Sequence, residues 1–406
     1  MIISLYKVLH IPAIGAAFIL RERQRVLKFG HQLMQLRRIT SGDRFIPEID
    51  GLRFAAISSV VCFHLYEYLR VKSGIPALGL VGTALHHGLR GVPLFFTISG
   101  FILGRPFAQH YISGGEAPQL KAYFLRRLSR LEPPYIISMV VFFALLAFSG
   151  RNKIYHLCAS LAYVHNLVYG TPSTVSSVAW SLEVEVQFYC LIPLIAVLYM
   201  APRRIRRMIL LVAMLAGTVH LLAIPDRVHL SLLGWFQCFA AGLLLADLYS
   251  DSWNPRQHWG FDVLSLALWP SIFLLNDKLT WILMPAMSFI LYVAAFRSFF
   301  FRRFFTLSIV TATGGMCYTI YLIHYQVISF AGRFSSRPAI IVVAALFLLA
   351  LASLAFFISV ERPCMGKDWP RKAMRLFNLP SQSLEVSEQT PLNCVSTVPV
   401  RADFHK

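Results

Sequence analysis

The stretch GLRFAAISSVVCFHL, residues 51–65, sets an arginine and a histidine into an otherwise apolar run. Arg53 and His64 are eleven residues apart, which at about 100° per residue is three turns, so both lie on one helix face. A rise of ~1.5 Å per residue separates them by roughly 16 Å along the axis. Because an ionisable residue inside a membrane span is costly, His64 predicts a functional site, with a hydrogen-bonded structural histidine as the alternative.

Composition extends the membrane prediction to the whole chain. Of its 406 residues 57% are hydrophobic and 14% are charged, against about 45–50% apolar and about 25% charged in soluble proteins. We therefore predict an all-α, polytopic transmembrane helical bundle. The net charge of +19 lies in short basic clusters between apolar runs, which indicates cytoplasmic loops and no nucleic-acid site. The 7 cysteines show no metal-binding spacing, so we expect no metal.

About ten core spans are predicted. They are roughly 54–70, 91–104, 133–149, 180–200, 208–224, 231–249, 261–276, 280–296, 308–330 and 338–360. With the segment before the first span in the cytoplasm, the inner segments carry 26 Lys and Arg and the outer segments carry 8. This asymmetry predicts that both core termini are cytoplasmic. Residues 154–169 are also apolar, but crossing there would invert every later loop, so we predict a re-entrant or surface helix on the outer side.

The two ends differ from this core in composition. Residues 1–44 form an N-terminal extension whose apolar part, 1–20, is either an extra span or an amphipathic anchor followed by a basic segment. Residues 45–377 form one transmembrane domain. Residues 378–406 are polar and without periodicity, which predicts a disordered tail.

Two further apolar helices carry notable residues. In GVPLFFTISGFILG, residues 91–104, Ser99 and Gly100 indicate either close helix packing or space for a ligand. In LRRLSRLEPPY, residues 125–135, a basic cluster precedes a span. Its arginines, which either anchor the span or grip phosphate oxygens, are Arg126, Arg127 and Arg130.

Carboxylates occur near the outer end of a later span, in VAWSLEVEVQFYCLIPL, residues 178–194. Glu183 and Glu185 face different directions on a helix, whereas Ser181 and Glu185 share a face. A carboxylate in this position needs a partner. We expect a histidine from another helix, with a buried structural ion pair as the alternative.

A late helix, GMCYTIYLIHYQVI at residues 315–328, places Tyr318, Tyr321 and His324 at intervals of three. Aromatic residues at such positions often form an interfacial belt, but a histidine among them is less usual. Together, the motifs place a histidine and a carboxylate in the outer half of the bundle and arginines at its inner face.

The ordered motifs of residues 45–365 resemble the membrane-bound acyltransferase-3 family, the O-acyltransferases of bacterial surface sugars. IDGLRFAAISSVVCFH matches the family's pattern of an arginine, ten residues and a histidine, at Arg53 and His64. GVPLFFTISGF matches its second helix, with Pro93 where aspartate is common. LRRLSRLEPPY, YTIYLIH and the closing ERP at 361–363 match in order, and WSLEVEVQFY selects Glu185 over Glu183.

The resemblance implies a multi-pass enzyme of the bacterial cytoplasmic (inner) membrane. Its co-substrate would be acyl-CoA, usually acetyl-CoA, with no permanently bound cofactor and a carbohydrate hydroxyl as acceptor. His64 would be catalytic, as general base or as acyl carrier, and Glu185 would orient it or bind the sugar. CoA phosphates would be held by Arg53, Arg126, Arg127 and Arg130. The remaining residues implied to line the site are Ser99, Trp180, Ser181, Tyr318, Tyr321 and His324.

Two other functions are compatible with the residues. A glycan or small-molecule transporter would use intramembrane His and Glu side chains as a proton relay, although we detect no inverted repeat. A scaffold with a degenerate site is less compatible, because Arg53, His64 and Glu185 are all present. The motifs specify neither the acceptor glycan, the acyl chain nor the oligomeric state.

Overall fold

The computed structural model describes residues 45–76, 78–148, 150, 153–215, 226–251, 256–366 and 369. Within these residues every regular element is a helix, which confirms the all-α prediction. Seven helical stretches there are long and apolar enough to cross a membrane. They are Pro47–Ser73, Gly79–Ser113, Leu120–Phe148, Ser177–Met200, Asp226–Ser250, Asp277–Arg297 and Pro338–Cys364.

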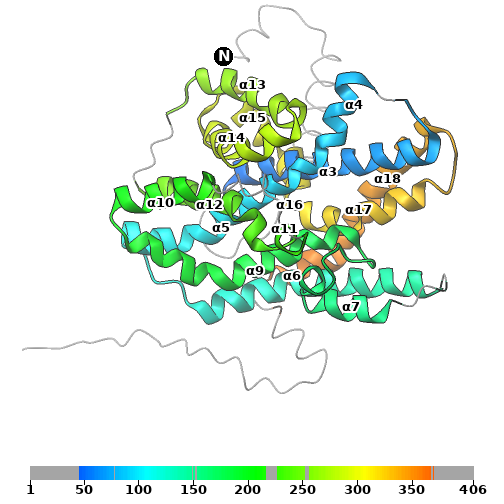
Figure 1. The fold of residues 1–406 in the computed structure, drawn as a ribbon, viewed down its shortest axis with the longest axis horizontal. Coiled ribbons are helices and arrows are strands. Elements are labelled where there is room, and N and C mark those ends of the chain that lie inside the picture. Colours follow the sequence, from blue (N-terminus) through cyan, green and yellow to red (C-terminus); the bar gives the residue numbers. More distant parts are fainter. Residues whose placement is uncertain are drawn as a thin grey trace, which may run out of the picture.

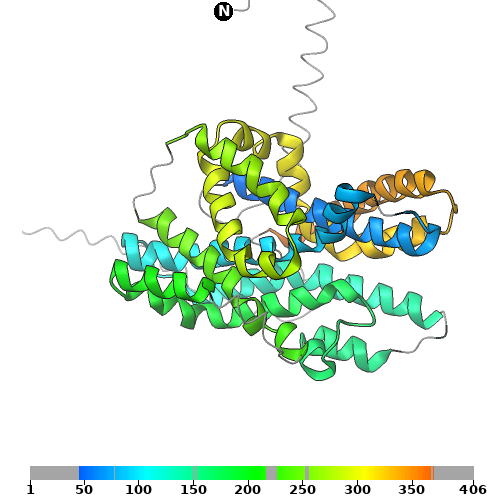
Figure 2. The same ribbon diagram turned by 45° about the horizontal axis from the view of Figure 1, so that its top comes forward.

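Helix α3 (Pro47–Ser73) occupies the centre of the bundle. Helices α13 (Gly260–Leu274), α14 (Asp277–Arg297) and α15 (Phe300–Phe305) gather on one side of it. Helices α6 (Leu120–Phe148) and α9 (Trp180–Ile195) lie on the other side, in both views (Figures 1 and 2).

Two further pairs of helices complete the bundle. Helices α17 (Cys317–Ala331) and α18 (Pro338–Phe356) pack on each other and against α3. The most extensive helix–helix contact in the described chain joins α5 (Gly91–Ser113) to α12 (Leu232–Ser250).

Three of the ten predicted spans are not among the seven. The one at 261–276 is α13, whose 15 residues extend about 22 Å, less than the ~30 Å hydrocarbon core. The one at 208–224 is described only as far as the end of α10 (Arg203–Leu215). The predicted features of residues 1–44 and 378–406 also lie outside the described residues.

The third, at 308–330, is broken into α16 (Ser308–Gly315) and α17. The helix packs closely on α3 just before the break, since a Cβ on Gly314 would lie 1.7 Å from the backbone oxygen of Asp50. Only glycine allows α16 to approach the start of α3 this closely, and α17 begins shortly after this contact, at Cys317.

The segment 154–169 does not form a span, as predicted. It folds into α7 (Ile154–Leu161) and α8 (His165–Tyr169), separated by Tyr163 at φ 56°. Glu183 is fully buried and accepts the backbone N–H of Asn166 at 2.8 Å. Asn166 in turn donates its side-chain amide to the carbonyls of Trp180 at 2.8 Å and Leu230 at 3.1 Å. Glu183 therefore fixes α8 against α9.

The α5–α12 crossing depends on two glycines. A Cβ on Gly100 would lie 2.3 Å from the Phe239 carbonyl oxygen, and one on Gly242 would lie 2.1 Å from the Thr97 carbonyl oxygen. These distances are far below van der Waals contact. Gly100 thus serves close helix packing, which is the first of the two roles predicted from the sequence.

Gly242→Val should prevent this close approach and lower the free energy of unfolding by roughly 1–3 kcal/mol or more, because overpacking forces backbone shifts. The melting temperature of the detergent-purified protein measures the effect. Gly366→Ala is the control, since its Cβ would meet the Pro363 carbonyl oxygen at an ordinary 3.4 Å. Equal melting temperatures for the two variants would contradict the packing argument.

Candidate active site

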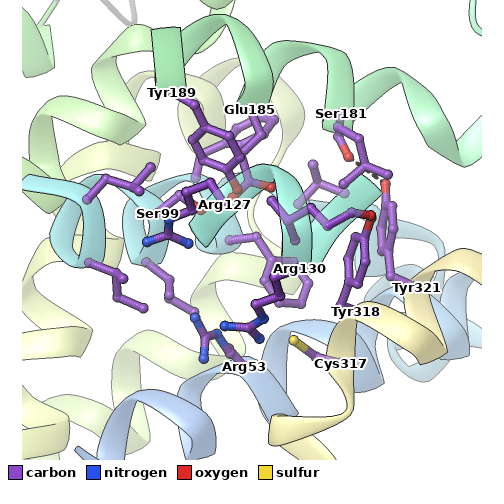
Figure 3. Close-up of a pocket in the computed structure, with 18 residues that line it drawn as sticks. Arg53, Ser99, Arg127, Arg130, Ser181, Glu185, Tyr189, Cys317, Tyr318 and Tyr321 are labelled. Carbon is purple, nitrogen blue, oxygen red and sulfur yellow. Dashed lines mark hydrogen bonds between the residues drawn. The ribbon is translucent and has the colours of Figure 1, made fainter. Parts of the chain in front are cut away.

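A cavity lies between α3, α5, α6, α9 and α17 (Figure 3). It contains about 760 Å³ of space between atoms, part of it open to solvent. Eight of the residues predicted for the site line it. They are Arg53, Ser99, Arg127, Arg130, Ser181, Glu185, Tyr318 and Tyr321.

One end of the cavity is cationic. Arg53 Nη1 donates to Asp50 Oδ1 at 2.6 Å. The guanidinium of Arg127 lies 5.6 Å from the ring centre of Tyr189, within cation–π range. Arg130 also faces the cavity (Figure 3). These contacts use only part of the five N–H donors of each guanidinium, so this end can bind an anion such as phosphate.

Glu185 shares the cavity with these arginines. One of its carboxylate oxygens accepts a hydrogen bond from Ser99 Oγ at 2.5 Å. Deeper along the cavity, the Tyr321 hydroxyl donates to the Val178 carbonyl at 2.8 Å and therefore accepts from Ser181 Oγ at 2.7 Å. Both cavity walls thus present fixed hydroxyl and carboxylate groups.

The two histidines form a pair of their own. Nε2 of His324 lies 3.1 Å from Nδ1 of His64, and their ring centres are 4.8 Å apart. The expected pairing of a histidine with Glu185 is therefore wrong for the described chain, because His64 contacts His324 and Glu185 contacts Ser99. Helix periodicity gives the face of each residue, but not which faces of separate helices meet.

The backbone carbonyls around His64 and His324 indicate which ring nitrogen of each neutral histidine carries the hydrogen. His324 Nδ1 lies 2.8 Å from the Tyr321 carbonyl and 3.1 Å from that of Ile320, so it carries the hydrogen and its Nε2 accepts. His64 Nδ1 lies 3.0 Å from the Val60 carbonyl, so one hydrogen there serves both Val60 and His324. His64 Nε2 is then left with a lone pair and can accept a proton.

Tyr321 connects the histidine pair to the cavity. It lines the cavity one helical turn before His324, and the two rings are 5.7 Å apart. Arg53 and His64 are three turns apart on α3, so the arginines lie towards one end of this helix and the histidine pair towards the other.

Four predicted residues do not line the cavity, and two of these, His64 and His324, form the histidine pair. Arg126 is exposed, and Trp180 packs between Phe96 and Trp235 with ring distances of 6.3 and 5.6 Å. The sequence reading missed Tyr189 and Cys317, which both line the cavity. Tyr189 could have been found, because it follows Glu185 by four residues and so shares its helix face.

A second, more apolar cavity of about 610 Å³ lies between α6 and α9. It shares Arg127, Glu185 and Tyr189 with the first and adds Glu132 and Tyr163. Among the described residues, no three His, Cys, Asp or Glu side chains are grouped so that they could hold a metal ion.

Glu361, the acid of the closing ERP motif, contacts Arg130 at the cationic end of the cavity but does not itself line the cavity. It is fully buried in η5 (Phe357–Glu361), a π-helical turn that continues α18. Its Oε2 accepts from Thr319 Oγ1 at 2.6 Å and from Thr319 N at 3.2 Å, in the first turn of α17. Its Oε1 lies 3.8 Å from Arg130 Nη2. Glu361 thus sets Arg130 relative to α17.

Comparisons with known proteins assign the chain to a family. A family model described as an acyltransferase domain, that of the acyltransferase-3 family, matches residues 46–361. A putative O-acetyltransferase of Staphylococcus aureus (strain COL) is 26% identical over 346 residues, 71% of this chain and 51% of that protein. The O-acetyltransferase OatA of Staphylococcus aureus (strain NCTC 8325 / PS 47) is 24% identical over 367 residues, 80% of this chain and 58% of OatA.

The chain thus spans about half the length of these curated relatives. No solved structure matches it. The matches support a transferase and give no support to the transporter alternative.

Replacing Glu361 should reveal its support of Arg130. Glu361→Ala should lower the free energy of unfolding by about 3 kcal/mol, because it leaves Thr319 without its acceptor and the partly buried Arg130 guanidinium without its ion-pair partner. Glu361→Gln keeps an oxygen for Thr319 and should cost clearly less. Melting temperatures of the purified variants measure both. If Glu361→Ala melts like the unmodified protein, the supporting role is excluded.

Proposed function

Because the chain belongs to the acyltransferase-3 family, we propose that it is a membrane O-acyltransferase. It moves an acetyl group from cytoplasmic acetyl-CoA to a sugar hydroxyl of a cell-surface or exported glycan. The observation that carries the proposal is the cavity that leads from three arginines to Tyr321, beside the His64–His324 pair. A bacterial inner-membrane location agrees with the family and with the loop charges.

The donor phosphates bind Arg53, Arg127 and Arg130. Guanidinium groups suit phosphate oxygens because their N–H donors match them in pairs. The roughly 16 Å between Arg53 and His64 is spanned by the pantetheine arm, which carries the thioester to the histidines. Glu185 and Ser99 line this path and orient the arm. The acceptor approaches from the opposite side.

His64 acts as general base in the transfer. Its Nε2 removes the proton of the sugar hydroxyl while that oxygen attacks the thioester carbonyl carbon. The C–S bond then breaks, and the leaving CoA sulfur takes the proton back from His64. His324 keeps the His64 Nδ1 hydrogen in place, which leaves Nε2 free to accept, and its contact stabilises the imidazolium that forms.

Removal of the base is the first test. His64→Ala should lower acetyl transfer by about 10²–10⁴-fold, the usual contribution of a general base. Transfer of label from radioactive acetyl-CoA to host glycan in isolated membranes measures it, with protein amounts equalised by immunoblot. His324→Phe, which removes the Nδ1 partner, should cost less than His64→Ala. Full transfer by His64→Ala would remove His64 from the mechanism.

Phosphate binding at the donor site is tested by comparing acetyl-CoA with a shorter acetyl donor that lacks the phosphates. Arg127→Ala should raise the KM for acetyl-CoA by about tenfold or more, the worth of one charged hydrogen bond. It should leave the KM for S-acetylpantetheine, which lacks the phosphates, unchanged.

Arg126→Ala is the matched control, since Arg126 is its exposed neighbour on the same helix. Identical effects of Arg127→Ala on both donors would contradict phosphate binding at this position.

A further inference from the structure

A cluster of polar and aromatic side chains, which we name the rim cluster, surrounds His64 on the side away from the arginines. It comprises Phe63, Glu67, His86 and Tyr325. The ring of Phe63 lies 4.9 Å from that of His64, and the ring of Tyr325 lies 5.5 Å from it. Both meet His64 edge-on, so two aromatic walls flank the proposed base.

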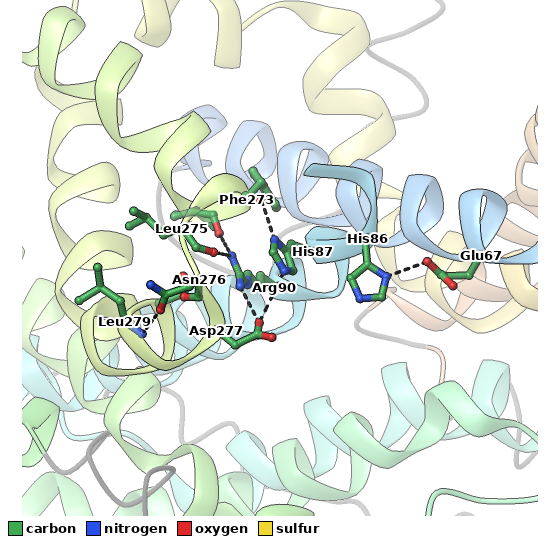
Figure 4. A network of polar contacts seen from close by, with 11 residues as sticks. Glu67, His86, His87, Arg90, Phe273, Leu275, Asn276, Asp277 and Leu279 are labelled. Carbon is green, nitrogen blue, oxygen red and sulfur yellow. Dashed lines mark hydrogen bonds and ion pairs between the residues drawn. The ribbon is translucent and has the colours of Figure 1, made fainter. Parts of the chain in front are cut away.

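The imidazole of His86 extends this surface. Its ring is 6.2 Å from that of Phe63, and its Nδ1 lies 2.8 Å from Glu67 Oε1 (Figure 4). Glu67 also accepts from Arg70 at 3.4 Å. The acidic group, the imidazole and the two aromatic rings thus form one continuous surface beside His64.

Packing against α3 determines where His86 lies. It ends α4 (Gly79–His86) and precedes η1 (His87–Arg90). A Cβ on Gly88 would lie 2.3 Å from the Ser59 carbonyl oxygen, so η1 presses directly on α3. Only a glycine permits that approach. The close packing of η1 on α3 places His86 next to Glu67.

The same segment is fixed from the α13–α14 side (Figure 4). His87 Nδ1 donates to the Phe273 carbonyl at 2.8 Å. Arg90, which is only 2% exposed, donates to the Ile272 carbonyl at 2.7 Å and to Asp277 Oδ1 at 2.6 Å. These contacts fix the backbone that follows His86, whose own side chain is 54% exposed.

The rim cluster lies near the C-terminal end of α3, where the helix becomes charged. The last turn of α3 carries Arg70 and Lys72, and charged groups of this kind belong at the interface or in water. Tyr325 is 44% exposed. A belt of aromatic residues would need neither a carboxylate nor an imidazole held against it, so the cluster has the composition of a binding surface.

We propose that the rim cluster binds the sugar ring of the acceptor beside His64. The proposal rests on the acyl-transfer function proposed above and assigns its acceptor side. The C–H face of a pyranose stacks on Phe63 and Tyr325, whereas its hydroxyls donate to the Glu67 carboxylate and bond His86. This places one ring hydroxyl against His64, across from the thioester.

The test separates acceptor binding from donor chemistry. Membranes of a host strain that carries each variant in place of the native copy receive radioactive acetyl-CoA. Label in the cell-envelope glycan reports transfer, and released acetate reports hydrolysis by water. Glu67→Gln and His86→Gln should each lower the ratio of transfer to hydrolysis by about tenfold, since each loses a bond to the sugar. Tyr325→Leu, on a separate helix, should lower it as well.

Lys72→Gln is the control, because it removes one charge from the same end of α3 and should leave the ratio as in the native protein. A ratio that stays unchanged in Glu67→Gln and His86→Gln would overturn the proposal. So would a parallel loss of transfer and hydrolysis, which indicates a structural role. If native membranes neither label glycan nor release acetate, the proposed function itself fails.

Discussion

The position of α3 is the constraint on which the rest of the site depends. This one helix carries Arg53 at the cationic end and His64 at the other, so its rigidity fixes their separation at three turns. Close approaches through glycines hold it in place. A Cβ on Gly51 would lie 2.3 Å from the Phe305 carbonyl oxygen, and one on Gly91 would lie 2.4 Å from that of Ala56.

The two ends of α3 meet different neighbours, which gives them different chemistry. At the cationic end α6 contributes Arg127 and Arg130, and the environment suits phosphate. At the other end α17 contributes His324, whose backbone contacts fix its own tautomer and thereby that of His64. In the proposed reaction, the acyl donor reaches from the arginines to His64, about three helical turns along α3. The proposed function uses this arrangement by bringing a cytoplasmic donor and an outer acceptor together at His64.

The sequence predicted the residues of the cavity better than their pairings. Arg53, Ser99, Arg127 and Glu185 all line it, as the family resemblance implied. The contacts between helices were not predictable in this way, and Glu185 meets Ser99 rather than a histidine. The close contact of Gly314 with the backbone of Asp50, just before the break between α16 and α17, was missed because Gly314 looks like an ordinary small residue in the sequence. The role of Glu361 required knowing that α18 returns to the start of α17.

The central claim is that one donor molecule connects the arginines to His64. A cryo-electron microscopy structure of the full chain with a non-hydrolysable acetyl-CoA analogue tests it most directly. The account predicts phosphates at Arg53, Arg127 and Arg130, and the acetyl carbonyl within hydrogen-bond or attack distance of His64 Nε2. An analogue bound with its phosphates elsewhere, or with its acetyl group held away from His64, would contradict it.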